Sequence, residues 1–179
     1  RQGTPTRLAA AEALRDFLAN VRMFDTLVKL ARDMAPFTGG TVVIAAAGNE
    51  SQPAYRVPLS QPANSDGVIS VGALERSPDG MRVARFSNTG PTVSAPGVDI
   101  LSAVPVRTPT EGKLRLMSGT SMAAPHAAGV AALWFESLRE DGKQAIAPIV
   151  TNYLVGETSL PFAVGTALND RGNGLVRAP

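Results

Sequence analysis

The segment Gly119-Thr120-Ser121-Met122-Ala123-Ala124-Pro125-His126 puts a hydroxyl group at the start of a helix built from small residues. Proline fits the opening turn of a helix, where backbone N–H groups have no acceptor within the helix. Those N–H groups and the helix dipole would stabilise negative charge that develops beside Ser121. The segment therefore indicates a nucleophilic serine, although a bare Gly-Thr-Ser would more often be an N-cap and a turn.

A second segment, Thr41-Val42-Val43-Ile44-Ala45-Ala46-Ala47-Gly48-Asn49-Glu50, is an apolar run that ends in small residues and an amide. Such a run predicts a buried parallel strand. Sites in open α/β sheets lie at the carboxyl ends of such strands, which is where Asn49 falls. Taken alone, Gly-Asn-Glu would be an ordinary turn.

Together these segments resemble the subtilisin-like serine proteases, the subtilases. In that family Gly-Thr-Ser-Met-Ala-x-Pro-His surrounds the catalytic serine, and the strand that ends in Gly-Asn supplies the side-chain donor of the oxyanion hole. The resemblance implies that Ser121 is the nucleophile and Asn49 the oxyanion donor. Further segments similar to the family follow in its order: Val68–Ala73, Arg85–Pro91, Ser94–Ile100 and, near the end, Gly172–Val176.

The resemblance implies an α/β fold, a doubly wound and mostly parallel sheet with helices on both faces. It is close over residues 40 to 136 and looser over 144 to 179. We divide the chain into a helical lead-in (1–40), the oxyanion strand through the nucleophile helix (41–136), and a closing helix and terminal strand (137–179). The segments that hold the family's catalytic Asp and His do not occur between Arg1 and Gly40. We therefore expect the C-terminal half of a catalytic domain.

Serine hydrolysis needs a base and a carboxylate that orients the base. The one histidine, His126, follows Ser121 by five residues, which on a helix is about 140° of rotation and about 7.5 Å of rise. It is expected to be a packing residue with its hydrogen bonds satisfied. The predicted function is a serine endopeptidase whose Asp and His come from a missing N-terminal half, so the isolated chain is inactive. The alternative is a non-catalytic scaffold or binding module with a subtilase fold.

The lead-in predicts an amphipathic helix that covers the sheet, with Thr4 as N-cap and Pro5 at its first position. A continuous helix from Thr6 to Met34 would span about 43 Å. That is long for this element in the family, so we expect a break between Asn20 and Met23.

The resemblance also implies a substrate pocket, with one wall formed by Ala45, Ala46, Ala47 and Gly48. Glu50 matches the pocket rim, where it would favour basic substrate residues, although a solvated loop glutamate is an equal alternative. Gln61-Pro62-Ala63 resembles a family turn with a cis proline. A structural calcium ion is possible, but no loop has a clear ligand set, and no cofactor is required.

Composition narrows the partners. The formal charge of +2 comes without basic runs, which argues against nucleic acid, and no stretch approaches the roughly 20 apolar residues of a membrane span. There is no cysteine, so disulfides are excluded. The resemblance implies a peptide or protein substrate and a secreted or periplasmic parent. A sheet cut through its middle would expose an apolar strand edge, which the N-terminal half or self-association would cover.

Overall fold

The computed structural model describes residues 5–105, 113–163 and 166–179. Its helices are α1 (Thr6–Asp33), α2 (Ala35–Thr38), α3 (Thr120–Glu140), α4 (Ala147–Gly156) and α5 (Leu168–Arg171). Its strands are β1 (Ile44–Ala46), β2 (Ile69–Ser77), β3 (Gly80–Val83), β4 (Val93–Pro96), β5 (Ile100–Ala103), β6 (Leu114–Met117), β7 (Thr158–Ser159) and β8 (Leu175–Val176).

The central sheet has the strand order β1-β2-β4-β8-β7, and β3 pairs with β2. The pairings of β1 with β2, β2 with β4 and β4 with β8 are parallel, whereas β3 and β7 pair antiparallel with their neighbours. β5 and β6 form a separate antiparallel hairpin. The predicted α/β fold with a mostly parallel sheet is confirmed.

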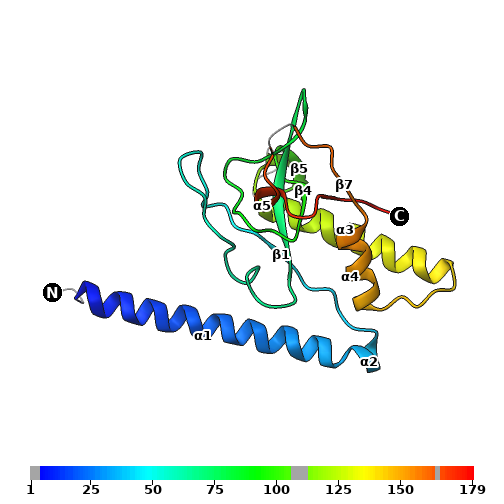
Figure 1. Ribbon diagram of the computed structural model, residues 1–179, viewed down its shortest axis with the longest axis horizontal. Coiled ribbons are helices and arrows are strands. Elements are labelled where there is room, and N and C mark those ends of the chain that lie inside the picture. Colours follow the sequence, from blue (N-terminus) through cyan, green and yellow to red (C-terminus); the bar gives the residue numbers. More distant parts are fainter. Residues whose placement is uncertain (1–4, 106–112, 164–165) are drawn as a thin grey trace.

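Helices cover both faces of the sheet because successive strand residues point to opposite sides. Ile69, Val71 and Ala73 of β2 belong to the main core with α3 and α4. Val68 and Ala45 belong to a smaller core with Val28 of α1. Figure 1 shows α1 as a long helix along the bottom of the view and α3 and α4 together on the right.

The nucleophile helix α3 lies close to the sheet because it presents alanines to it. Ala123, Ala127 and Ala131 recur every four residues, and all three are buried. Farther along α3, Trp134 stacks on Tyr153 of α4 with the ring centroids 4.5 Å apart. Its indole Nε1 donates to the carbonyl of Arg177 at 2.9 Å, which fastens the C-terminal segment to the same helix.

β1 forms one edge of the sheet. Val43 accepts a hydrogen bond from Ile69 N, and Ala47 N donates to Val71 O, so these residues turn their backbone groups toward β2. In a parallel strand the alternate residues, here Ile44 and Ala46, direct their backbone N–H and C=O groups away from that neighbour, toward the other edge of the strand. Within the described part of the chain no strand pairs with β1 on that side.

The first helix departs from the prediction. α1 runs without a break from Thr6 to Asp33, so the expected break at Asn20 to Met23 is wrong. The reason is local: neither Gly nor Pro occurs between these ends, and strong helix formers dominate the sequence. Pro5 is the N-cap rather than the first helical residue, and Thr4 lies outside the described residues.

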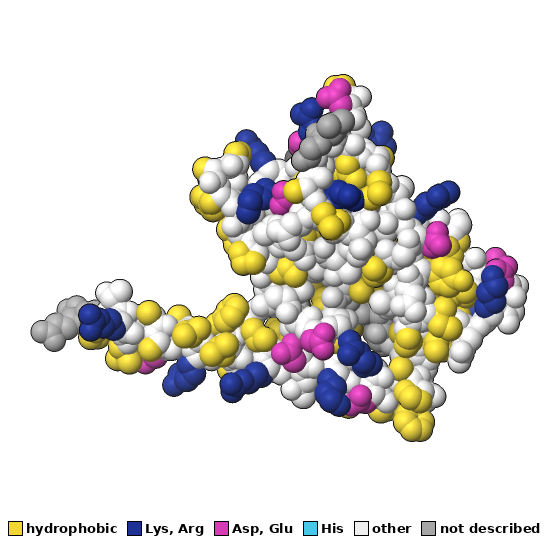
Figure 2. Space-filling model, viewed as in Figure 1, with side chains coloured by type: hydrophobic (Ala, Val, Ile, Leu, Met, Phe, Trp, Pro, Cys, Tyr) yellow, Lys and Arg dark blue, Asp and Glu magenta, His cyan; other side chains and the backbone are white. Residues whose placement is uncertain are grey.

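The prediction that this helix covers the sheet is correct only for its C-terminal part. Val28 is the buried residue of α1, whereas Leu14, Phe17 and Leu18 are 44–59% exposed. Figure 2 shows the N-terminal part of the helix projecting from the body with apolar side chains on its surface. None of the helices in the described residues is long and apolar enough to span a membrane.

The core position of Leu154 gives a stability prediction. This α4 side chain is fully buried in the main core. We expect Leu154→Ala to lower the free energy of unfolding by about 2–5 kcal/mol, because the substitution leaves a cavity. Urea unfolding of the 179-residue chain measures the loss, with Leu168→Ala as control because Leu168 is 65% exposed. Equal stability of the two variants would contradict the packing described here.

Candidate active site

Ser121 is the second residue of α3 and is exposed. The first turn of α3 is closed by Gly119 O, which accepts from Met122 N at 3.0 Å and from Ala123 N at 3.4 Å. Because the helix begins at Thr120, Pro125 lies inside α3 and not in its opening turn, contrary to the prediction. Proline has no N–H, so the carbonyl of Ser121 lacks the helical donor that residue 125 would otherwise supply.

Asn49 is joined to this helix start through Thr120. The Oδ1 atom of Asn49 accepts from Thr120 N at 2.8 Å and from Thr120 Oγ1 at 3.0 Å. A backbone N–H only donates, so the atom it meets must be the amide oxygen. The Nδ2 donor therefore occupies the other branch of the amide, and it is the group that an oxyanion needs. The structure thus brings Asn49 to the start of α3, in contact with Thr120, the residue before Ser121.

Thr120 connects the two candidate site residues, and the sequence patterns did not single it out. Its side chain is fully buried. Besides donating to Asn49, its hydroxyl accepts from Gly48 N at 3.2 Å. Thr120 therefore links the loop after β1 to the nucleophile helix. The only signal in the sequence was its place in the Gly-Thr-Ser segment.

The chain approaches Ser121 through a tight contact between two glycines. Gly119 N donates to Gly97 O at 2.8 Å. A Cβ atom on Gly97 would lie 2.7 Å from Ala73 Cβ and 2.9 Å from Gly119 O, so no other residue fits without a shift of the backbone. Two residues on, Asp99 has a φ of 54°, and its N–H donates to Ser118 Oγ at 3.0 Å. These contacts fix the segment that leads into α3.

The predicted pocket residues occupy different environments. Ala45 packs with Val28 and Val68, and Ala47 is fully buried. Ala46 and Gly48 are partly exposed. The four residues follow one another along β1 and its end, and their role in a substrate pocket stays a prediction.

Glu50 is exposed, yet its carboxylate is held in place. Oε2 accepts from Asn88 Nδ2 at 2.7 Å and from Ser60 Oγ at 3.0 Å. Desolvation raises the pKa of Glu50, but the hydrogen bonds from Asn88, Ser60 and the backbone N–H groups of Glu50 and Asn49 outweigh it, so the pKa lies below its ordinary value. Glu50 is therefore an anchored anion at neutral pH rather than a freely solvated side chain.

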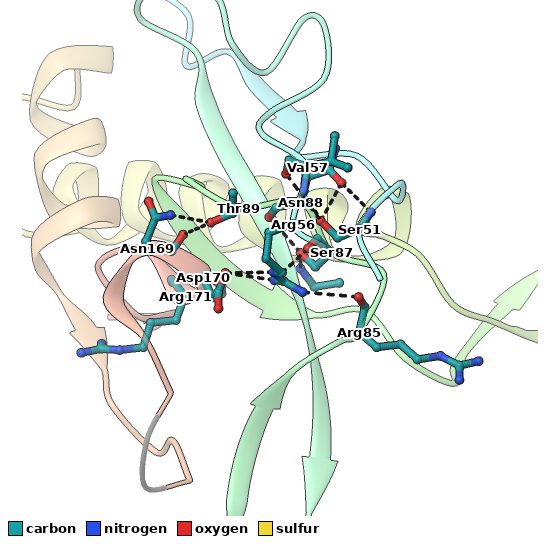
Figure 3. A network of polar contacts seen from close by, with 12 residues as sticks. Ser51, Arg56, Val57, Arg85, Ser87, Asn88, Thr89, Asn169, Asp170 and Arg171 are labelled. Atoms are coloured by element: carbon teal, nitrogen blue, oxygen red, sulfur yellow. Dashed lines mark hydrogen bonds and ion pairs between the residues drawn. The ribbon is translucent and has the colours of Figure 1, made fainter. Parts of the chain in front are cut away.

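A polar network holds the loops around the site to the C-terminal part of the chain. Arg56 donates to Asp170 Oδ1 from Nε at 3.2 Å and from Nη2 at 3.0 Å, and its Nη2 also donates to Ser87 O at 3.1 Å. Figure 3 shows Arg56 between Asp170 of α5 and the 85–88 segment. Thr89 Oγ1 donates to the carbonyl of Asn169 at 2.8 Å. The loop that carries Asn88 is therefore fastened from both sides.

The His126 side chain makes a hydrogen bond, as expected, but it is not packed in the interior. Nδ1 lies 2.8 Å from Met122 O, which turns the ring back along its own helix. The side chain is exposed and borders a cavity with Ile100, Ser102, Met122 and Pro125, so the expected packing is wrong. Among the described residues, Ile100 and Ser102 of β5 line this cavity beside the ring.

Two remaining expectations concern Pro62 and metal ions. The Gln61–Pro62 bond is cis, as predicted. In the described ranges no group of three His, Asp or Glu side chains is arranged to hold a metal ion.

Comparison with known proteins bears on the family and the fold of the chain. A sequence profile described as the subtilase family matches residues 19–166, beginning inside α1. The extracellular basic protease of Dichelobacter nodosus is 41% identical over 124 residues, which are 67% of this chain and 20% of that protein. The extracellular protease of Xanthomonas campestris pv. campestris is 35% identical over 178 residues, 98% of this chain and 29% of that relative.

Among solved structures, the prenylagaramide maturation protease PagA is similar with a TM-score of 0.66 and 28% identity, and the match covers 85% of this chain and 53% of PagA. This chain spans less than a third of the length of the two extracellular proteases. Since the family profile covers most of the chain and the fold agrees, the chain belongs to the subtilase family, as its serine and asparagine segments predicted.

Proposed function

We propose that this chain carries the nucleophile and the oxyanion hole of a serine endopeptidase. The observation that supports this most directly is the pair of hydrogen bonds from Thr120 to Asn49 Oδ1, which orient the amide beside Ser121. In the proposed reaction Ser121 Oγ attacks the peptide carbonyl carbon and gives its proton to a base. Asn49 Nδ2 and the Ser121 backbone N–H stabilise the oxyanion. The protonated base then donates to the leaving amine, and water hydrolyses the acyl-enzyme.

The base and its orienting carboxylate are proposed to come from another segment. His126, the one histidine of the chain, is directed to the carbonyl of Met122. We propose that the N-terminal half of the same domain supplies the missing His and Asp. Self-association is an alternative only for covering the open edge of the sheet, because a second copy carries no histidine other than His126. The PagA match, which covers about half of that chain, supports a domain larger than this one.

Two surfaces are suited to receive such a segment. One is the open edge of β1. The other is a row of side chains on α1 and its C-cap residue Met34. The row consists of Met23, Leu27, Leu30 and Met34, which recur at intervals of four, three and four residues and are 45–58% exposed. This spacing places them on one stripe of the helix, as in helices that pack against a second helix. A strand beside β1 and a helix beside α1 would cover both.

Labelling with a fluorophosphonate tests the proposal. We expect a single adduct on the chain, detected by intact mass above the 18.6 kDa of the free chain, when the N-terminal half is present. Ser121→Ala should abolish the adduct, and the chain alone should label far more slowly. Absence of labelling in the assembled protein would reject the proposal and favour a non-catalytic binding module.

We further propose that Glu50 favours basic side chains before the scissile bond. Its carboxylate is anchored and charged at neutral pH. Glu50→Gln should lower the ratio of kcat/KM for arginine to that for norleucine about two- to fivefold, the effect of an exposed ion pair. Glu140→Gln, at the far end of α3, is the matched control.

The wild-type ratio should fall as the pH drops through the lowered pKa of Glu50, because the carboxylate then loses its charge. A ratio that Glu50→Gln leaves unchanged would remove Glu50 from the pocket.

We also propose that the whole protein is exported, because the relatives from D. nodosus and X. campestris are named extracellular proteases. Fractionation of the source cells, with activity expected outside the cytoplasm, tests this.

A further inference from the structure

The side chain of Asn88 is fully buried and uses every polar atom of its amide. Oδ1 accepts from Glu50 N at 3.0 Å, from Ser51 N at 3.0 Å and from Ser51 Oγ at 3.2 Å. Nδ2 donates to Glu50 Oε2 at 2.7 Å, to Pro58 O at 3.0 Å and to Ser60 Oγ at 3.2 Å. Figure 3 shows Asn88 between the loop of Ser51 and Val57 and the segment that continues to Thr89.

These bonds hold the backbone on both sides of the oxyanion donor. Before Asn49, the carbonyl of Gly48 accepts from Asn88 N at 3.1 Å. After Asn49, the N–H groups of Glu50 and Ser51 meet Asn88 Oδ1. Asn49 therefore lies between two backbone segments that are both hydrogen-bonded to Asn88, a residue far away in the sequence.

The other branch of the same amide reaches the rim carboxylate. Asn88 Nδ2 binds the Glu50 carboxylate, and Asn88 Oδ1 binds the backbone that follows Asn49. Asn88 therefore connects the Glu50 side chain to the loop that carries Asn49. We propose that Asn88 is a positioning residue that couples the group at position 50 to the alignment of the oxyanion donor. This inference rests on the proposed function, because it assigns a role in that same site.

Asparagine suits this position because it donates and accepts from one planar group. Aspartate keeps the acceptor side but has no donor. Asn88→Asp would also put two carboxylates at hydrogen-bond distance, so one must take up a proton or move. The close approach of the amide depends on Gly48, where a Cβ atom would lie 2.3 Å from Asn88 Nδ2.

A four-member cycle tests the coupling in the assembled enzyme: wild type, Asn88→Asp, Glu50→Gln and the double variant. The readouts are kcat and KM on a substrate with norleucine before the scissile bond, so that attraction between charges does not contribute. We expect Asn88→Asp to lower kcat by about 30-fold with Glu at position 50, within the roughly 10²-fold that a 1 Å misplacement costs. In the Glu50→Gln background, Asn88→Asp should lower kcat by less than about threefold, because the Gln side-chain amide donates to the new Asp carboxylate. KM should change little in both backgrounds.

Equal losses of kcat in the two backgrounds would overturn the coupling. The coupling would also be overturned if adding Glu50→Gln to Asn88→Asp restored Tm but not kcat, since the contact between positions 50 and 88 would then support only stability. If Asn88→Asp does not fold, Asn88→Ser replaces it: kcat should fall with KM retained, and an unchanged kcat overturns the proposal. If a fluorophosphonate does not label the wild-type enzyme, the proposed function itself is rejected. If the wild-type enzyme is labelled but Asn88→Asp lowers kcat equally in both backgrounds, only the role of Asn88 is rejected.

Discussion

Alanine at position 121 is expected to lower kcat of the assembled protease by about 10⁶-fold, with KM nearly retained. The size is that found for removal of the catalytic serine of a subtilisin, so it is taken from the family rather than derived from this chain. The physical reason is that the acyl-enzyme has no oxygen on which to form, while the surfaces that bind peptide remain. Steady-state hydrolysis of a peptide substrate measures the loss.

The matched control is Ser137→Ala, which makes the same change on the same helix α3. It should keep kcat within about twofold, as expected for a change outside the chemistry. Activity of Ser121→Ala within tenfold of wild type would show that another group is the nucleophile.

The second expected result concerns the oxyanion donor: Asn49→Ala lowers kcat by about 10²–10³, again a range measured in a subtilisin. The negative oxygen exists only in the transition state and the intermediate, so KM should change little. The structure separates this role from a positional one. Asn49→Asp keeps an oxygen for Thr120 N and Thr120 Oγ1 but replaces the donor by an acceptor.

Asn49→Asp should therefore lose at least as much turnover as Asn49→Ala, even though it retains the contacts to Thr120. If the aspartate variant keeps wild-type turnover, the amide donor takes no part in catalysis. Thermal melting of both variants serves as the control, because a change in kcat without a change in Tm separates chemistry from stability.

Features set by short stretches of sequence could be predicted. The apolar run that forms β1 and the helix after Gly119 follow from adjacent residues, and the cis bond before Pro62 was implied by the resemblance of Gln61-Pro62-Ala63 to a family turn. The failures concern elements whose surroundings decide their form. A break in α1 was expected from the usual length of this element in the family, but nothing in the residues from Thr6 to Asp33 interrupts a helix.

The contacts of Thr120 and the proposed role of Asn88 could not be predicted because they depend on distant segments of the chain. Thr120 meets Asn49 across 71 positions, and Asn88 meets Glu50 across 38. Neither residue type is unusual in its own segment, where serine, threonine and asparagine commonly cap turns. Burial gives the decisive signal: both side chains are fully enclosed and fully hydrogen-bonded, which only the folded chain reveals.

The link from Thr120 to Asn49 has a consequence for how the protease would be switched on. In the proposed assignment the nucleophile and the oxyanion donor are carried by one chain and joined through Thr120, so arrival of the partner need not reorganise the electrostatics around them. What it adds is a proton acceptor. The chemical part of activation would then be the His–Asp pair for proton transfer that the partner brings. A partner lacking its histidine would dock onto a site that stays inactive, giving a dominant inhibitor made from the enzyme's own sequence.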